Sequence, residues 1–151
     1  MSLIDTLKSD LNGSLKSGEA QRAETLRGLL SSIHNEEIAK RTKGGDSELS
    51  EEEVIGVLQK EAKKRREAIE IYGKAGRGDL EDKEKKELDL IGLYLPPQLE
   101  RAEIENIVSK VISGSDEGFG QVMGKVMKEV SGRADSKVVS EIVKEKLNQK
   151  E

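Results

Sequence analysis

The stretch Gly118–Leu147, GFGQVMGKVMKEVSGRADSKVVSEIVKEKL, predicts two helices joined by a tight turn. The first helix repeats apolar residues at the three- and four-residue spacing of one helical face: Val122, Met123, Val126, Met127 and Val130. Ser131-Gly132 then ends it, because glycine adopts the left-handed conformation common after helix C-termini. Asp135 is suited to cap the second helix. The expected buried positions of that helix are Val138, Val139, Ile142, Val143 and Leu147.

Similar periodicity elsewhere predicts an all-α protein. We expect helices at about residues 2–16, 19–41, 51–72, 80–93, 101–113, 119–130 and 136–148. The same spacing places Leu15 on the buried side of the first helix and Ile38 on that of the second. Ser50 with Glu53 has the pattern of a capping box, and Asp79 is the expected cap of the fourth helix. Pro96-Pro97 ends that helix, because proline cannot continue a helix and restricts the residue before it. The sequence therefore predicts an N-terminal domain of about four helices (1–95) and a C-terminal three-helix domain (96–151).

Composition limits the class of protein. The chain is 37% charged and only 2% aromatic, with a net charge of −4, which argues against a general nucleic-acid coat or a DNA-binding protein. It has no cysteine, so no disulfide framework is expected. We see no signal peptide at Met1–Asp5 and no apolar run of about 20 residues. We therefore expect a cytoplasmic protein without membrane attachment.

No catalytic or metal-binding constellation is evident. His34 is the single histidine, lies mid-helix, and is interpreted as a surface or half-buried residue. Nucleophilic catalysis and zinc sites both need clustered residues that this sequence lacks. The glycine-rich loop 73–78 lacks the Walker order and is interpreted as a connection between helices. We predict no catalytic residue, no metal and no cofactor.

The basic run Lys63-Lys64-Arg65-Arg66 spans just over one helical turn, so its side chains face several directions. One interpretation is a solvated face whose charges pair with Glu61, Glu67 and Glu70, as helical neighbours do. The alternatives are a contact with RNA phosphates and a contact with a partner protein.

Residues 120–151 carry seven basic and five acidic residues, a local positive excess on a negative chain. The candidate nucleic-acid residues there are Lys125, Lys128, Gly132, Arg133 and Lys137. Arg133 precedes a helix N-terminus, whose free amides favour phosphate. Such contacts would be salt-sensitive and carry little sequence information. Gly120 and Gly124 lie four residues apart, so another backbone could approach closely. Phe119, the one nearby aromatic residue, is a candidate for stacking on a base, and the plainer interpretation places it in the core.

Several motifs occur together and in order. Those in the N-terminal half are Asn35-Glu36-Glu37-Ile38, Leu58-Gln59-Lys60-Glu61, Lys64–Ile69, Lys74–Arg77 with Asp79-Leu80, and Tyr94-Leu95-Pro96 with Gln98-Leu99. Those in the C-terminal half are Met123–Met127 and Gly132–Asp135 with Val139 and Ile142-Val143. On these residues the chain resembles the YqeY family, also called the GatB/YqeY-like family, over essentially its whole length. It departs at Glu100, where the family often has Ser or Thr as a helix cap.

The resemblance implies an all-α protein whose C-terminal domain is similar to the tail of the GatB subunit of tRNA-dependent amidotransferases. That enzyme amidates Glu-tRNA or Asp-tRNA, its tail helps to hold the tRNA, and related modules are fused to glutaminyl-tRNA synthetases. The family is accordingly labelled as carbon–nitrogen ligases with glutamine as amide donor. The catalytic body of GatB and the glutamine-hydrolysing subunit have no counterpart in this chain, and a shared fold does not carry chemistry with it.

Three functions follow as hypotheses. The first is a tRNA-binding accessory module, with tRNA and an aminoacyl-tRNA synthetase or amidotransferase as partners. The second is a protein–protein adaptor that docks through the Gly120/Gly124 face or the long N-terminal helices. The third is an amidotransferase in its own right.

Overall fold

The structure is a computed structural model that describes residues 1–114 and 116–150. Over these residues it is all-helical, as predicted, and contains no strand. Its helices are α1 (Leu3–Ser17), α2 (Ala20–Thr42), α3 (Glu51–Lys74), α4 (Gly78–Gly92), α5 (Arg101–Ser113), α6 (Phe119–Val130) and α7 (Ser136–Lys150). The chain divides into two compact units, Met1–Leu95 and Pro96–Glu151, each with its own core.

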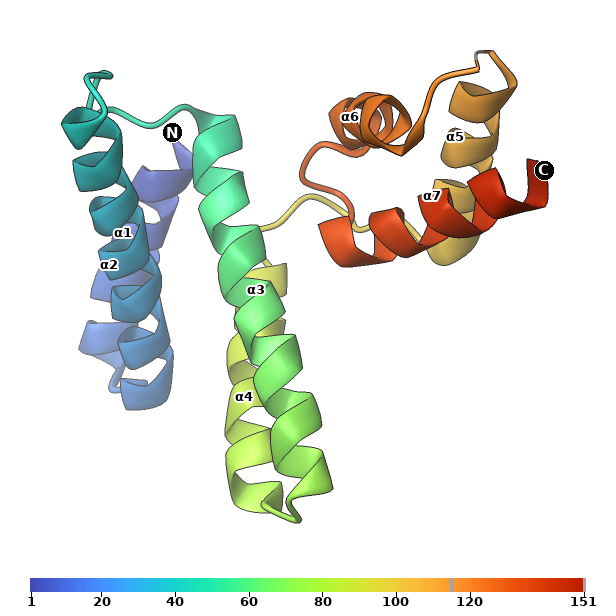
Figure 1. Ribbon diagram of the computed structural model, residues 1–151. Coiled ribbons are helices and arrows are strands. Elements are labelled where there is room, and N and C mark those ends of the chain that lie inside the picture. The colour runs from blue at the N-terminus through green and yellow to red at the C-terminus, as the bar shows by residue number, and fades with distance from the viewer. Residues whose placement is uncertain (115, 151) are drawn as a thin grey trace. The chain divides into compact units, whose positions relative to one another are not determined.

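The N-terminal unit consists of two helical hairpins (Figure 1). Helix α1 packs along α2, α3 packs along α4, and α2 also contacts α3 and α4. Its buried core consists of Leu7, Leu26, Leu29, Ile33, Leu49, Val54, Val57, Leu58, Ala62 and Ile91. Because aliphatic residues fill this core, the charged residues other than Glu61 are left to positions outside it.

Local sequence signals set the starts of α1 and α3. The Ser50 hydroxyl accepts a hydrogen bond from the Glu53 amide at 3.1 Å, and the Glu53 carboxylate accepts one from the Ser50 amide at 3.2 Å. This is the predicted capping box, and Ser2 with Asp5 forms a second one at the start of α1. These reciprocal bonds satisfy amides that have no partner within the helix.

Three predictions were wrong in this unit. Helix α4 begins at Gly78, one residue before the predicted cap Asp79, which instead forms an ion pair with Arg77 at 3.2 Å. Leu15 and Ile38, whose spacing places them on buried faces, are 48% and 46% exposed. In the last turn of α1 the inward position belongs to Ser14, which is 2% exposed, so the apolar stripe ends before Leu15.

The C-terminal unit is a bundle in which α5, α6 and α7 each contact the other two. Its buried core consists of Ile104, Val108, Ile112, Val122, Val126, Val130, Ala134, Val139, Ile142 and Val143. The segment leading into the unit is pinned to the α6–α7 turn, since the Leu99 amide donates to the Arg133 carbonyl at 2.7 Å. Glu100 precedes α5 without a side-chain capping bond, consistent with its departure from the family pattern.

Candidate nucleic-acid interface

Helices α6 and α7 hold the C-terminal candidate residues in fixed positions. Val122, Val126 and Val130 bury one face of α6, so Lys125 and Lys128 lie on its exposed side. The helix ends at Ser131, and Gly132 takes the predicted left-handed conformation with φ 74°. The Asp135 carboxylate accepts a hydrogen bond from the Lys137 amide at 3.3 Å, as expected of the residue that caps α7.

An open hollow lies along the exposed side of α6. Its volume is about 380 Å³, and its lining residues are Glu117, Gly120, Gln121, Gly124, Lys125 and Lys128. A Cβ atom built on Gly120 or Gly124 would have no other atom within 4 Å. Packing within the unit therefore does not require glycine at either position, although glycine weakens a helix by roughly 1 kcal/mol relative to alanine.

The basic side chains around the hollow differ in how far they are engaged. Lys125 pairs with Glu117 at 2.7 Å, and the Arg133 guanidinium donates to the Glu129 carbonyl at 2.6 Å. The Arg133 bond satisfies a carbonyl at the C-terminal end of α6, which gives this side chain a structural role as well. Lys128 and Lys137 are exposed, and neither side chain bonds to another residue within the described ranges.

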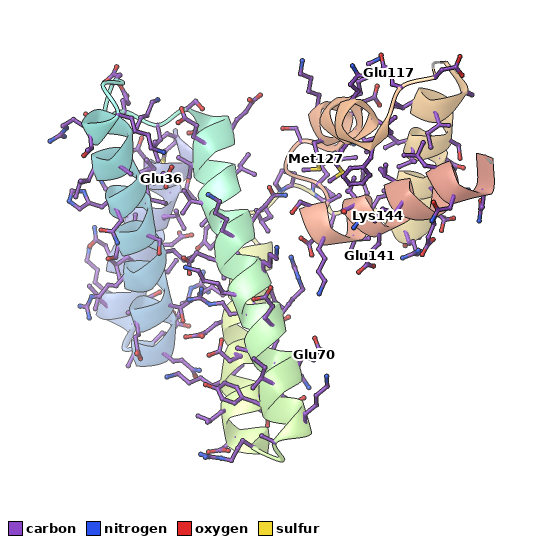
Figure 2. The ribbon with its side chains drawn as sticks, in the orientation of Figure 1. Glu36, Glu70, Glu117, Met127, Glu141 and Lys144 are labelled. Atoms are coloured by element: carbon purple, nitrogen blue, oxygen red, sulfur yellow. The ribbon has the colours of Figure 1, made fainter. Side chains whose placement is uncertain are left out.

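Sequence reasoning missed one basic residue of this region. Lys144 of α7 places its ammonium group 5.7 Å from the centroid of the Phe119 ring, a cation–π arrangement. Figure 2 shows Lys144 on α7, on the same helix as Glu141. Phe119 is 39% exposed, so its predicted place in the core was wrong. The sequence holds no signal for this contact, because the two residues are brought together only by the packing of α6 on α7.

The basic run on α3 belongs to the other unit and is engaged by acidic residues. Lys64 pairs with Glu61 at 3.1 Å, whereas Arg65 pairs with both Glu61 and Glu87. The Lys64 side chain is 70% exposed and the Arg65 side chain only 15%. The predicted salt-bridged interpretation therefore describes Lys64 and Arg65, and Arg66 is engaged with other groups of the described chain as well. An RNA contact by Lys63 or Arg66 stays a prediction.

The two acidic partners of Arg65 have opposite pKa shifts. Burial raises the pKa of Glu61, but hydrogen bonds from Arg65, Lys64 and Ser32 outweigh it, so the net shift is downward. Burial and the neighbouring Glu84 raise the pKa of Glu87 above its usual range, despite the attraction of Arg65. Glu61 is thus the carboxylate that the fold stabilises as an ion.

The described residues gather no set of three or more His, Cys, Asp or Glu side chains that could hold a metal ion. His34, with a side chain 69% exposed, lies on the surface of α2, 3.8 Å from Glu37. Among the helices of residues 1–114 and 116–150, none is long and apolar enough to cross a membrane. Of the charges counted in 120–151, Glu151 falls outside the described residues.

Known proteins resemble the chain over most of its length. A protein named "Altered inheritance of mitochondria protein 41, mitochondrial" from Vanderwaltozyma polyspora is 33% identical over 118 residues, which are 77% of this chain and 62% of that protein. Its namesake from Lachancea thermotolerans is 33% identical over 112 residues, covering 73% and 58% of the two chains. An uncharacterized protein of Schizosaccharomyces pombe is 37% identical over 90 residues, 60% of this chain and 69% of the relative.

The chain spans less than two thirds of the length of the two mitochondrial relatives. Their names do not confirm the predicted cytoplasmic location. Residues 4–147 match the model of the family described as "Yqey-like protein", which confirms the resemblance seen in the motifs. The chain belongs to the YqeY family.

Proposed function

We propose that the C-terminal unit binds tRNA and that the protein is an accessory module for tRNA aminoacylation or amidation. The observation that carries the proposal is the hollow on α6, where two glycines leave the backbone bare beside Lys125 and Lys128. A phosphate chain can approach such a surface closely, and ammonium groups at its edge supply the attraction. We choose tRNA as the bound polymer because the C-terminal unit resembles the tail of GatB, which helps to hold tRNA.

The distribution of free charge supports the same surface. Lys128 and Lys137 extend from α6 and from the first turn of α7 without a described ion-pair partner. Because these contacts read phosphate rather than bases, we expect affinity for tRNA without strong sequence preference.

The test is the binding of labelled bulk tRNA, compared with duplex DNA, by fluorescence anisotropy over a salt series. We expect affinity for tRNA that falls with salt, and a loss in the variant Lys125→Glu/Lys128→Glu/Arg133→Glu. If all three residues contact phosphates, the slope of log affinity against log salt should shrink by about 2 to 3, from roughly 0.7 to 0.9 per contact. A matched control that reverses three exposed lysines outside the candidate set, Lys8→Glu/Lys16→Glu/Lys83→Glu, should keep the wild-type slope.

Arg133 also bonds to the end of α6, so its substitution could act through the fold. The double variant Lys128→Glu/Lys137→Glu avoids this, since neither side chain has a described structural contact. Circular dichroism should show unchanged helix content, while tRNA affinity falls. Absence of binding by the wild-type protein even at low salt would overturn the proposal, because phosphate contacts are strongest there.

The bare glycine surface also suits a second candidate, a protein adaptor. Exposed glycines allow the backbone of a partner helix to approach α6 closely. This function predicts a protein that co-purifies with the chain and is lost on substitution of Gly120 and Gly124, with no retention of RNA.

A further inference from the structure

A second, smaller pocket lies between α2 and α3 in the N-terminal unit. Its volume is about 210 Å³, and it is lined by Ser32, Asn35 and Glu36 of α2 and by Val57, Lys60, Glu61 and Lys64 of α3. Figure 2 shows Glu36 on α2. All of these residues except Val57 carry polar groups, and none belongs to the proposed tRNA surface.

The back of this pocket is a buried carboxylate held in place from both helices. Glu61 is 7% exposed and is the one charged residue among the buried positions of the described chain. It accepts hydrogen bonds from Ser32 of α2 at 2.9 Å, from Lys64 at 3.1 Å, and from Arg65. These partners neutralise its charge and fix its orientation, so this wall of the pocket is preorganised.

The other polar groups of the pocket are uncommitted. Asn35, Glu36 and Lys60 have side chains that make no hydrogen bond or ion pair with any residue the structure describes. Together they offer one negative group, one positive group and one amide that can both donate and accept. Glu36 and Lys60 come from different helices and line the same pocket, so they could engage opposite ends of one ligand.

We propose that this pocket binds a small zwitterion of the free α-amino acid class. The ligand's ammonium group would pair with Glu36 and its carboxylate with Lys60, while the Asn35 amide would bond to one of these two groups. An anion alone would leave Glu36 unpaired beside it, and a cation alone would meet Lys60. The pocket volume of about 210 Å³ leaves room for a molecule of this size.

The test is titration of the ¹⁵N-labelled full chain with the standard L-amino acids at millimolar concentrations, followed by amide shifts at residues 35, 36, 60 and 61. L-alanine is compared with propionate, which lacks the ammonium group, and with ethylammonium, which lacks the carboxylate. We expect at least one amino acid to bind in a saturable way and both single-charge probes to bind far more weakly.

Variants separate this site from general surface charge. Glu36→Gln and Lys60→Gln should each weaken binding by about tenfold or more, because each removes a charge-assisted contact. Glu24→Gln on α2 and Lys63→Gln on α3, which do not line the pocket, should bind like the wild type. The proposal is overturned by the absence of saturable shifts, by equal binding of propionate or inorganic phosphate, or by equal affinity in all four variants. No RNA is present, so the result is independent of the tRNA proposal.

Discussion

Positive charge is arranged differently on α3 and around the α6–α7 turn. On α3, Arg65 lies between the carboxylates of Glu61 and Glu87, and Lys64 shares Glu61. Around the α6–α7 turn, Lys128 and Lys137 reach solvent without a described acidic partner. The turn region has an ion pair as well, Lys125 with Glu117, but only the run on α3 pairs with a buried carboxylate, that of Glu61.

This difference shows that a basic run cannot be interpreted without the acids that share its surface. Surface ion pairs contribute little to stability, but they occupy charges that a phosphate would otherwise bind. A buried pair acts differently, because removing one partner leaves the other uncompensated. Three predictions test how far the two regions differ.

The largest effect is expected for Glu61→Ala, which leaves the guanidinium of Arg65 without its closest partner. We expect a loss of about 3 kcal/mol in the free energy of unfolding, the lower end of the range for breaking a buried pair. Urea unfolding followed by tyrosine fluorescence measures this, because Tyr72 and Tyr94 both lie in the N-terminal unit.

The matched control is Lys64→Ala, whose exposed bond to the same carboxylate should contribute less than about 1 kcal/mol. The downward pKa shift of Glu61 means that its contribution is present above about pH 4.3 and is lost as pH falls through its lower folded-state pKa. Equal losses in Glu61→Ala and Lys64→Ala would mean that α3 carries only surface pairs.

A smaller effect is expected when the glycines of α6 are replaced. Gly120→Ala and Gly124→Ala should each stabilise the C-terminal unit by up to about 1 kcal/mol, because helical glycine is unfavourable and the added methyl meets no atom. Amide hydrogen exchange of α6 measures the gain. Affinity for tRNA should fall in the same variants, since the methyl groups occupy the hollow.

Gly132→Ala is the control for the substitutions at positions 120 and 124, and it should lower rather than raise the stability of the C-terminal unit. Gly132 has φ 74°, where a side chain is strained, so alanine should destabilise the unit. Variants at positions 120 and 124 that gain stability and keep full tRNA affinity would show that the bare surface of α6 takes no part in binding.

The smallest effect is expected for Glu87→Gln. The pKa of Glu87 is raised in the fold, so its ionised form is disfavoured there and the wild type loses stability as pH rises through that pKa. We therefore expect the variant to match or slightly exceed the wild type at neutral pH, by less than about 0.5 kcal/mol. Urea unfolding at neutral and acidic pH checks this. A loss of unfolding free energy as large as that of Glu61→Ala would contradict this prediction, because Glu87 would then stabilise the fold as much as Glu61 does.

Signals within one helix turn predicted most of the fold. Ser50 with Glu53 fixed the start of α3 through bonds three residues apart, and Gly132 marked the turn after α6 because it adopts a positive φ. The start of α4 was missed because Arg77 competes locally for Asp79. The exposure of Leu15 was not predicted, because periodicity does not show how far along α1 the other helices continue to cover its apolar face.

The sites were less predictable, since they depend on how helices are aligned. The pairing of Glu61 with the basic run was predicted from spacing along α3, but the contact of Arg65 with Glu87 needs the packing of α3 on α4. The polar pocket brings Glu36 of α2 near Lys60 of α3, and the Lys144–Phe119 contact joins α7 to α6. No pattern in a single helix encodes such pairs.

Hydrogen bonds join residues 96–99, which lead into the C-terminal unit, to the α6–α7 turn, so a ligand bound at the turn would also affect this segment. The Leu99 amide donates to the Arg133 carbonyl, and the Gln98 side chain donates to the carbonyls of Gly132 and Pro96. A ligand that holds the turn would therefore also hold residues 96–99. Occupancy at Arg133 would then appear as resistance to proteases at this segment, so a cleavage ladder could report binding without any label on the ligand.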